Sequence, residues 1–131
     1  MATFLQCLTK EQALNLTGIK NRLAHFAAER NWDQFHSPKN LSMGLAAEAA
    51  ELLEIFQWLT EKQSCEIIGD EKEMQHVRDE MADVFIYLVR LADKLNVNIE
   101  EAVMEKIELN ESRYPVELSR GNATKYSRRQ K

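Results

Sequence analysis

Two pairs of acidic residues have the spacing that places both members of each pair on one flank of a helix. Glu48 and Glu51 are three residues apart, and so are Glu80 and Asp83. At about 100° per residue, Glu48 lies roughly 60° from the centre of an apolar stripe and Glu51 roughly 60° further round. Glu80 lies at the edge of a second apolar stripe, with Asp83 one turn on. Two such pairs on two helices could face one another.

Carboxylates that are partly withdrawn from water repel one another unless a cation neutralises them. Magnesium prefers oxygen ligands and keeps several waters, which leaves positions for phosphate oxygens and an attacking water. We therefore expect Mg²⁺ at these four residues, with Mn²⁺ able to substitute. Salt bridges on solvated helix flanks are the alternative. A di-iron site is disfavoured, because neither Glu48 nor Glu80 has a histidine three residues later.

Apolar residues recur at helical spacing in four segments, and these are the elements that must position the carboxylates. The Ser37–Pro38 pair disfavours helix at Ser37, so we predict a loop before the second segment. The predicted order is a helix from Thr9 to near Asn31, a loop from Trp32 to Asn40, a helix from Leu41 to about Thr60, a polar stretch from Gln63 to Asp70, a helix over the stripe Val77 to Leu95, and a helix from Ile99 to before Pro115.

Four helices with short connections predict an all-α, four-helix bundle. A length of 131 residues fits a single domain spanning residues 1–131, with a flexible basic tail from about residue 119. The apolar arcs of the second and third helices are wider than one neighbour needs, because Leu53, Ile86 and Val89 extend them. We therefore expect a homo-oligomer, with a tetramer favoured over a dimer.

The bulk composition excludes several classes of protein. A net charge of -4 argues against capture of nucleic acid polymers by a basic surface, so a phosphate ligand needs a bridging cation. No apolar run is long enough for a membrane span, and the N-terminus does not resemble a signal peptide. Cys7 and Cys65 lack the spacing of a disulfide framework or zinc site. We expect a cytoplasmic protein.

The loop between the first two helices is rich in flat side chains. Trp32, Phe35 and His36 offer faces on which a nucleobase can stack, and a loop can wrap a ligand. A hydrophobic anchor for the loop is the alternative. On the fourth helix Lys106, Asn110 and Arg113 share one face and could bind a triphosphate. A solvated surface is the alternative.

Together these segments resemble a known family. EAAE at 48 to 51 and EMAD at 80 to 83, separated by 28 residues, are similar to the two motifs of the MazG-like nucleotide pyrophosphatases. Residues 20 to 127 are most similar to the dCTP pyrophosphatase branch. The similarity is found in FAAERNWDQFHSPKNL, EAAELLEIFQW, DEMADVFIYLVRLA, RYP and KYS.

This resemblance implies that the protein hydrolyses a nucleoside triphosphate to the monophosphate and pyrophosphate. The preferred substrate would be dCTP or a modified dCTP, and the reaction would remove unwanted nucleotides from the cellular pool. The resemblance also implies that Glu48, Glu51, Glu80 and Asp83 bind magnesium, and that a metal-activated water attacks the α phosphorus, with Glu48 or Glu51 orienting it. The implied substrate contacts are His25, Trp32, Asp33, Gln34, Phe35, His36, Trp58 and Tyr87.

Two other functions stay open on the sequence. A dUTPase or a phosphoribosyl-ATP pyrophosphohydrolase would have similar metal pairs on the same scaffold. A non-catalytic helical interaction module could keep the scaffold without the chemistry, although the intact carboxylates argue against it. Base preference depends on a few hydrogen bonds whose geometry spacing does not give.

Overall fold

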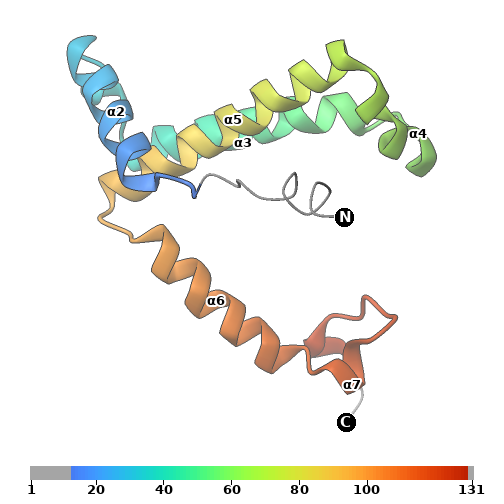
Figure 1. Ribbon diagram of the computed structural model, residues 1–131. Helices are drawn as coiled ribbons and strands as arrows, with labels where there is room; N and C mark the ends of the chain where they lie inside the picture. The colour runs from blue at the N-terminus through green and yellow to red at the C-terminus, as the bar shows by residue number, and fades with distance from the viewer. Residues whose placement is uncertain (1–12, 130–131) are drawn as a thin grey trace, which may run out of the picture. The chain divides into compact units, whose positions relative to one another are not determined.

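The computed structural model describes residues 13–129, and within them every regular element is helical (Figure 1). The chain divides into two compact units, Met1–Leu91 and Ala92–Lys131. The predicted helix start at Thr9 lies outside the described residues. The first unit contains α2 (Leu16–Glu29), the 3-10 turn η1 (Asp33–Phe35), α3 (Pro38–Phe56), α4 (Glu61–Glu66), η2 (Ile67–Gly69) and most of α5 (Glu71–Lys94).

Helix α2 ends where Asn31 adopts a left-handed backbone conformation, with φ of 53°. The N–H of Asn31 donates to the carbonyl of Ala28 at 3.1 Å, and the N–H of Trp32 donates to that of Ala27 at 2.9 Å. These two bonds form a Schellman motif, in which asparagine is one of the few residues that tolerates the left-handed position. The Trp32 ring then packs edge-on against the Phe26 ring, with 5.6 Å between the ring centroids. The end of α2 therefore determines where Trp32 lies.

The connection between α2 and α3 is shorter than the predicted loop. Helix α3 begins at Pro38, because proline is favoured in the first turn and Ser37 caps the helix by accepting from the N–H of Asn40 at 3.1 Å. The side chain of Asn40 also donates to the carbonyl of Phe35 at 3.0 Å. The prediction of a loop up to Asn40 is therefore wrong at its C-terminal end. Hydrogen bonds fix the connection both at the end of α2 and at the start of α3.

Helices α3 and α5 lie side by side and run in opposite directions (Figure 1). Gly44 on α3 meets Tyr87 on α5, and Glu48 lies beside Asp83. The buried apolar residues of this unit are few, namely Ala27, Leu41, Val77 and Val89. Val89 is buried here, so it does not widen an apolar surface as we predicted.

The predicted polar stretch from Gln63 to Asp70 lies mostly within α4 and η2, two helical elements that the sequence did not predict. Thr60 and Gln63 form a capping box that starts α4, and this local pairing outweighs the polar composition. Cys65 on α4 is exposed and forms no disulfide. No helix within residues 13–129 has the length and hydropathy needed to cross a membrane.

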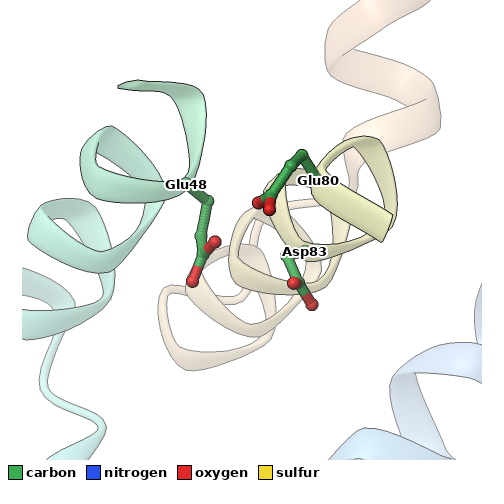
Figure 2. A group of neighbouring side chains, drawn as sticks. All are labelled: Glu48, Glu80 and Asp83. Carbon is green, nitrogen blue, oxygen red and sulfur yellow. The ribbon is translucent and has the colours of Figure 1, made fainter. Parts of the chain in front are cut away.

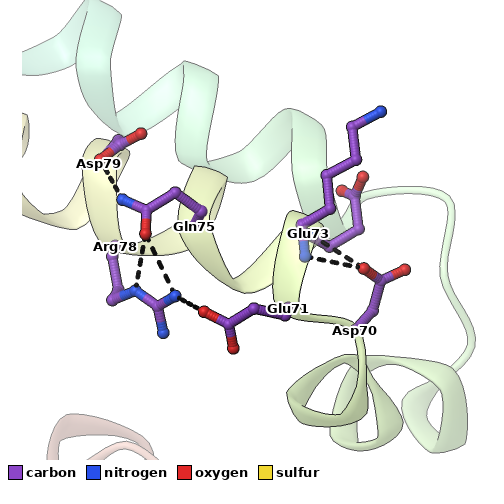
Figure 3. Close-up of polar contacts among 7 residues, drawn as sticks. Asp70, Glu71, Glu73, Gln75, Arg78 and Asp79 are labelled. Atoms are coloured by element: carbon purple, nitrogen blue, oxygen red, sulfur yellow. Dashed lines mark hydrogen bonds and ion pairs between the residues drawn. The ribbon is translucent and has the colours of Figure 1, made fainter.

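Side-chain contacts define the start and the exposed face of α5 (Figure 3). Asp70 accepts from the N–H groups of Lys72 and Glu73, both at 3.1 Å, and so caps the helix. Further along, Arg78 pairs with Glu71 and with Gln75. These contacts explain why α5 begins at Glu71, six residues before the predicted stripe starts at Val77.

The second unit contains α6 (Ile99–Arg113), α7 (Val116–Ser119) and the 3-10 turn η3 (Tyr126–Arg128). The bounds of α6 match the predicted fourth helix. Arg129 donates to the carbonyl of Arg113 at 3.1 Å and to the hydroxyl of Ser119 at 2.9 Å. These are specific contacts in a segment for which composition alone predicted flexibility.

Candidate functional site

Three of the four predicted metal ligands lie together where α3 and α5 meet. One carboxylate oxygen each from Glu48, Glu80 and Asp83 lies within 4.8 Å of the other two. Figure 2 shows Glu48 on α3 across from Glu80 and Asp83 on α5. Glu48 of α3 thus lies opposite Glu80 and Asp83 of α5 at the contact between the two helices.

The cluster resists ionisation. Burial raises the pKa of Glu48 from 4.5 to about 7, and a hydrogen bond to Glu51 and the negative charges of Glu51, Asp83 and Glu80 add to this effect. Desolvation also raises the pKa of Glu80, followed by the charge of Glu51. Both shifts have the direction expected for carboxylates held close together without a counter-charge.

The donor set fits a hard divalent cation. Oε2 of Glu80 is buried and has no hydrogen-bond partner among the described residues. A divalent cation would satisfy this oxygen and would offset the negative charges of the neighbouring carboxylates. All the donors are carboxylate oxygens, the ligands that Mg²⁺ prefers. Glu51, the fourth predicted ligand, borders an open hollow lined by Glu51, Glu54, Ile55, His76 and Glu80.

An apolar cavity of about 360 Å³ adjoins the cluster. It is formed by residues of α2, the α2–α3 connection, α3 and α5, and Glu48 and Asp83 belong to its lining. A neighbouring hollow of about 290 Å³ shares Trp32, His36 and Tyr87 with it. The remaining lining residues of the larger cavity are Leu23, Phe26, Leu41, Ile86 and Arg90.

Tyr87 owes its place in the cavity wall to a glycine on the facing helix. A Cβ on Gly44 would lie 2.3 Å from Cε1 of Tyr87 and 2.7 Å from Cζ. Any side chain there would collide with the aromatic ring. Gly44 therefore allows the close approach of α3 to the Tyr87 ring.

The structure brings several predicted substrate contacts to this cavity and leaves others outside it. Trp32, His36 and Tyr87 line the larger cavity, and Phe35 lines the neighbouring hollow. Asp33 pairs with Arg90. Gln34 is exposed, and its side-chain amide donates to the carbonyl of Asn31 at 3.0 Å.

His25 is not in the cavity wall. Its side chain is 74% exposed and lies 3.1 Å from a carboxylate oxygen of Glu29. Leu23 and Phe26, three residues apart on the same helix, face the cavity instead, and helical geometry turns His25 away from both. The substrate contact of His25 stays a prediction.

Three other predicted contacts are Trp58, Lys106 and Asn110. Trp58 follows α3, is 87% exposed and lines neither cavity. Lys106 and Asn110 lie on α6 in the second unit, with exposed side chains. Arg113, on the same helix, stacks its guanidinium over the ring of Tyr126 at 4.6 Å. Substrate contacts of Trp58, Lys106 and Asn110 stay predictions.

Sequence reasoning missed Gly44, Leu23 and Arg90. A glycine inside an otherwise strong helical pattern is a signal of close packing and could have identified Gly44. An arginine within the apolar run VFIYLVRLA could have identified Arg90, because a charge in such a run needs a buried partner.

Comparisons with known proteins agree with this architecture. Residues 45–128 match the model of the MazG-like family. The dCTP pyrophosphatase 1 of Mus musculus is 45% identical over 112 residues, which cover 86% of this chain and 66% of the mouse protein. The Homo sapiens protein of the same name is 41% identical over 112 residues, which cover the same fractions of the two chains. The chain thus spans slightly less than two-thirds of the length of these relatives.

A solved structure is also similar over almost its whole length. A pyrophosphatase from Archaeoglobus fulgidus superposes with a TM-score of 0.72 and 38% sequence identity, covering 82% of this chain and 98% of that one.

Proposed function

The chain belongs to the MazG-like family, and from this premise we propose that it hydrolyses nucleoside triphosphates, dCTP and modified dCTP foremost, to the monophosphate and pyrophosphate. The observation that supports this most directly is that Glu48 and Asp83 belong both to the carboxylate cluster and to the wall of the aromatic cavity. A nucleotide has the matching division into a flat, weakly polar base and a charged phosphate chain.

In this proposal the cavity binds the nucleoside. Trp32, His36 and Tyr87 offer ring faces to the base and sugar, and the volume of about 360 Å³ lies in the range of small-molecule sites. Aromatic stacking on a base contributes about 1–3 kcal/mol in other nucleic-acid binders. The carboxylate end of the cavity then receives the triphosphate.

Glu48, Glu80 and Asp83, with Glu51 beside them, would hold Mg²⁺, and Mn²⁺ would substitute. Bound Mg²⁺ supplies positive charge to the phosphate oxygens and lowers the pKa of a bound water. Glu48 or Glu51 orients the attacking water and takes its proton. The apolar wall around Leu41 and Ile86 excludes bulk water and strengthens these electrostatic interactions.

The test is a panel of nucleoside triphosphates assayed for pyrophosphate release with Mg²⁺ and with Mn²⁺. We expect the highest kcat/KM on dCTP or a 5-modified dCTP. Asp83→Asn and Glu48→Gln should each reduce kcat/KM by at least about 100-fold, more than the loss of an outer-shell partner of a metal ligand.

Glu105→Gln, an exposed change on α6, is the matched control and should keep wild-type rates. Preference for dUTP or phosphoribosyl-ATP would move the substrate assignment to those relatives on the same scaffold. Absence of pyrophosphate release from every nucleotide would refute the enzymatic proposal and favour a helical interaction module.

We further propose a cytoplasmic homo-oligomer, a tetramer before a dimer. Large apolar side chains exposed on this chain support the assembly, among them Leu53, Trp58 and Met81. A pool-cleaning activity and two cysteines without a pairing pattern support the location. Cell fractionation with an antibody to the protein tests the location.

A further inference from the structure

Arg90 on α5 is a buried charged residue at the cavity wall. Its side chain is only 5% exposed, and it lines the same cavity as Trp32 and Tyr87. A guanidinium keeps its proton at all ordinary pH values, so the charge cannot be removed by titration. Burial of such a charge is stable only with a partner of opposite charge and with its hydrogen-bond donors engaged.

Asp33 is the partner of opposite charge. Nη2 of Arg90 lies 2.9 Å from Oδ1 of Asp33, across 57 positions of sequence. The two residues are unequal, because the Asp33 side chain is 47% exposed. Water can solvate Asp33 if Arg90 is lost, but it cannot reach Arg90 to the same extent if Asp33 is lost.

The same nitrogen of Arg90 also contacts His36. Nη2 lies 3.2 Å from Nδ1 of the imidazole. Nη2 has two hydrogens and no lone pair to accept with, so one hydrogen is directed to Asp33 and the other to His36. Nδ1 of His36 must then accept. An imidazole that accepts at Nδ1 has its proton on Nε2.

We propose that Arg90 is the positioning residue of the nucleoside cavity. By bonding to Asp33 and His36 it fixes the Trp32–His36 segment against α5, and it holds His36 as the tautomer with its proton on Nε2. This inference rests on the proposed function, because the cavity it shapes is the one assigned to the base and sugar.

Arg90 does not belong to the carboxylate cluster, so its removal should act on substrate binding. Arg90→Met keeps the length of the side chain and leaves Asp33 able to take water, so we expect a folded protein. For dCTP we expect KM to rise roughly tenfold while kcat stays within about threefold of wild type. The Kd for dCMP, measured by calorimetry without metal, should rise in parallel.

Nitrogen NMR of the His36 ring gives a readout that a purely structural role would not change. In the wild-type protein Nε2 should be protonated and Nδ1 should have the chemical shift of an unprotonated acceptor. In the Arg90→Met variant His36 should lose this single tautomer. Arg90→Lys restores a buried cation but not the planar fork, so it should recover KM only in part.

Arg78→Met is the matched control, since Arg78 is an exposed arginine on the same helix that contacts Glu71 and Gln75. It should leave KM and the His36 tautomer unchanged. Protonation of Nδ1 in the wild-type protein, or Arg90→Met with wild-type KM and dCMP affinity, would overturn the inference. If no triphosphate is hydrolysed, the proposed function fails, while the tautomer and dCMP measurements still decide the role of Arg90.

Discussion

The environment of Glu48 in the folded chain disfavours the ionised carboxylate. The free energy of unfolding should therefore depend on pH. The pKa of Glu48 is about 7 in the folded chain against 4.5 for an ordinary glutamate, mainly through burial. Between these pH values the folded state binds more protons than the unfolded state, so stability falls as pH rises. Below about pH 4.5 the penalty is absent, and above about pH 7 it is fully present.

We therefore predict that the metal-free protein melts at a lower temperature at pH 8 than at pH 5.5. One group contributes a slope of at most about 1.4 kcal/mol per pH unit. Glu48→Gln should flatten the slope, and Mg²⁺ should raise the melting temperature more at pH 8 than at pH 5.5. Thermal melts with EDTA and with Mg²⁺ measure both effects.

Glu105→Gln serves as the control for these melts, because Glu105 is an exposed residue of α6. It should leave the slope unchanged. A Glu48→Gln variant with the same pH slope as the wild-type protein would assign the effect to other groups.

At this scale the sequence predicted the carboxylates well and their surroundings less well. Three-residue spacing indicated that the two acidic pairs could face one another, and Glu48, Glu80 and Asp83 do lie together. The role of His25 stays a prediction, because the resemblance does not say which side of α2 meets a substrate. Arg90 shows a limit of prediction from sequence, because its partners Asp33 and His36 are more than 50 positions away in sequence.

Among the elements, the contact between α3 and α5 depends on Gly44. Alanine is about 1 kcal/mol better than glycine inside a helix, but a methyl group forced against the Tyr87 ring should cost about 1–3 kcal/mol. We predict that Gly44→Ala lowers stability and raises KM, as measured by denaturant unfolding and steady-state kinetics.

Gly69→Ala provides the comparison for this prediction. A Cβ at Gly69 in η2 would meet no atom within 4 Å, so stability and KM should stay near wild type. Equal tolerance of alanine at both glycines would show that Tyr87 moves aside without cost.

The end of α2 gives a second prediction at the level of elements. Asn31 has a φ of 53°, a conformation that costs most L-residues about 1–2 kcal/mol. Asn31→Val should lower the free energy of unfolding by about this amount and displace Trp32, whereas Asn31→Gly should be tolerated. Chemical denaturation of the two variants measures the difference, and equal losses would refute the assignment to the backbone.

Helix bounds were predictable where a strong stop or start signal exists. Asn98 and Pro115 frame α6, and its bounds match the prediction. The predicted loop ends too late, because proline disfavours helix at Ser37 but is itself favoured in the first helical turn. Helix α4 was missed, since its capping box is a local device without an apolar stripe.

At the scale of the whole molecule, the proposed assembly predicts a mass that is a multiple of 15.2 kDa. Leu53 on α3 is 58% exposed, and a charge there should weaken a contact between copies. We predict that the wild-type protein scatters light as an oligomer at micromolar concentration and that Leu53→Lys shifts it toward smaller species. Lys62→Glu, which changes an exposed residue of α4, should leave the size of the oligomer unchanged.

A wild-type protein of 15.2 kDa in light scattering would refute the oligomer. The sequence predicted the all-α class because four segments have strong helical periodicity. It did not predict the division into two compact units at Leu91, because the apolar stripe continues through that position without a break. The number of copies depends on exposed side chains such as Leu53, whose partners periodicity cannot identify.

The intrinsic fluorescence of the two tryptophans can report on the cavity. Trp32 lies in the cavity wall within contact range of Phe26 and His36, while Trp58 is almost fully exposed. Their emission should therefore differ in wavelength, with Trp58 at the red end. With Trp58→Phe, the remaining fluorescence would report solely on the cavity, so nucleotide entry could be followed in real time without a label.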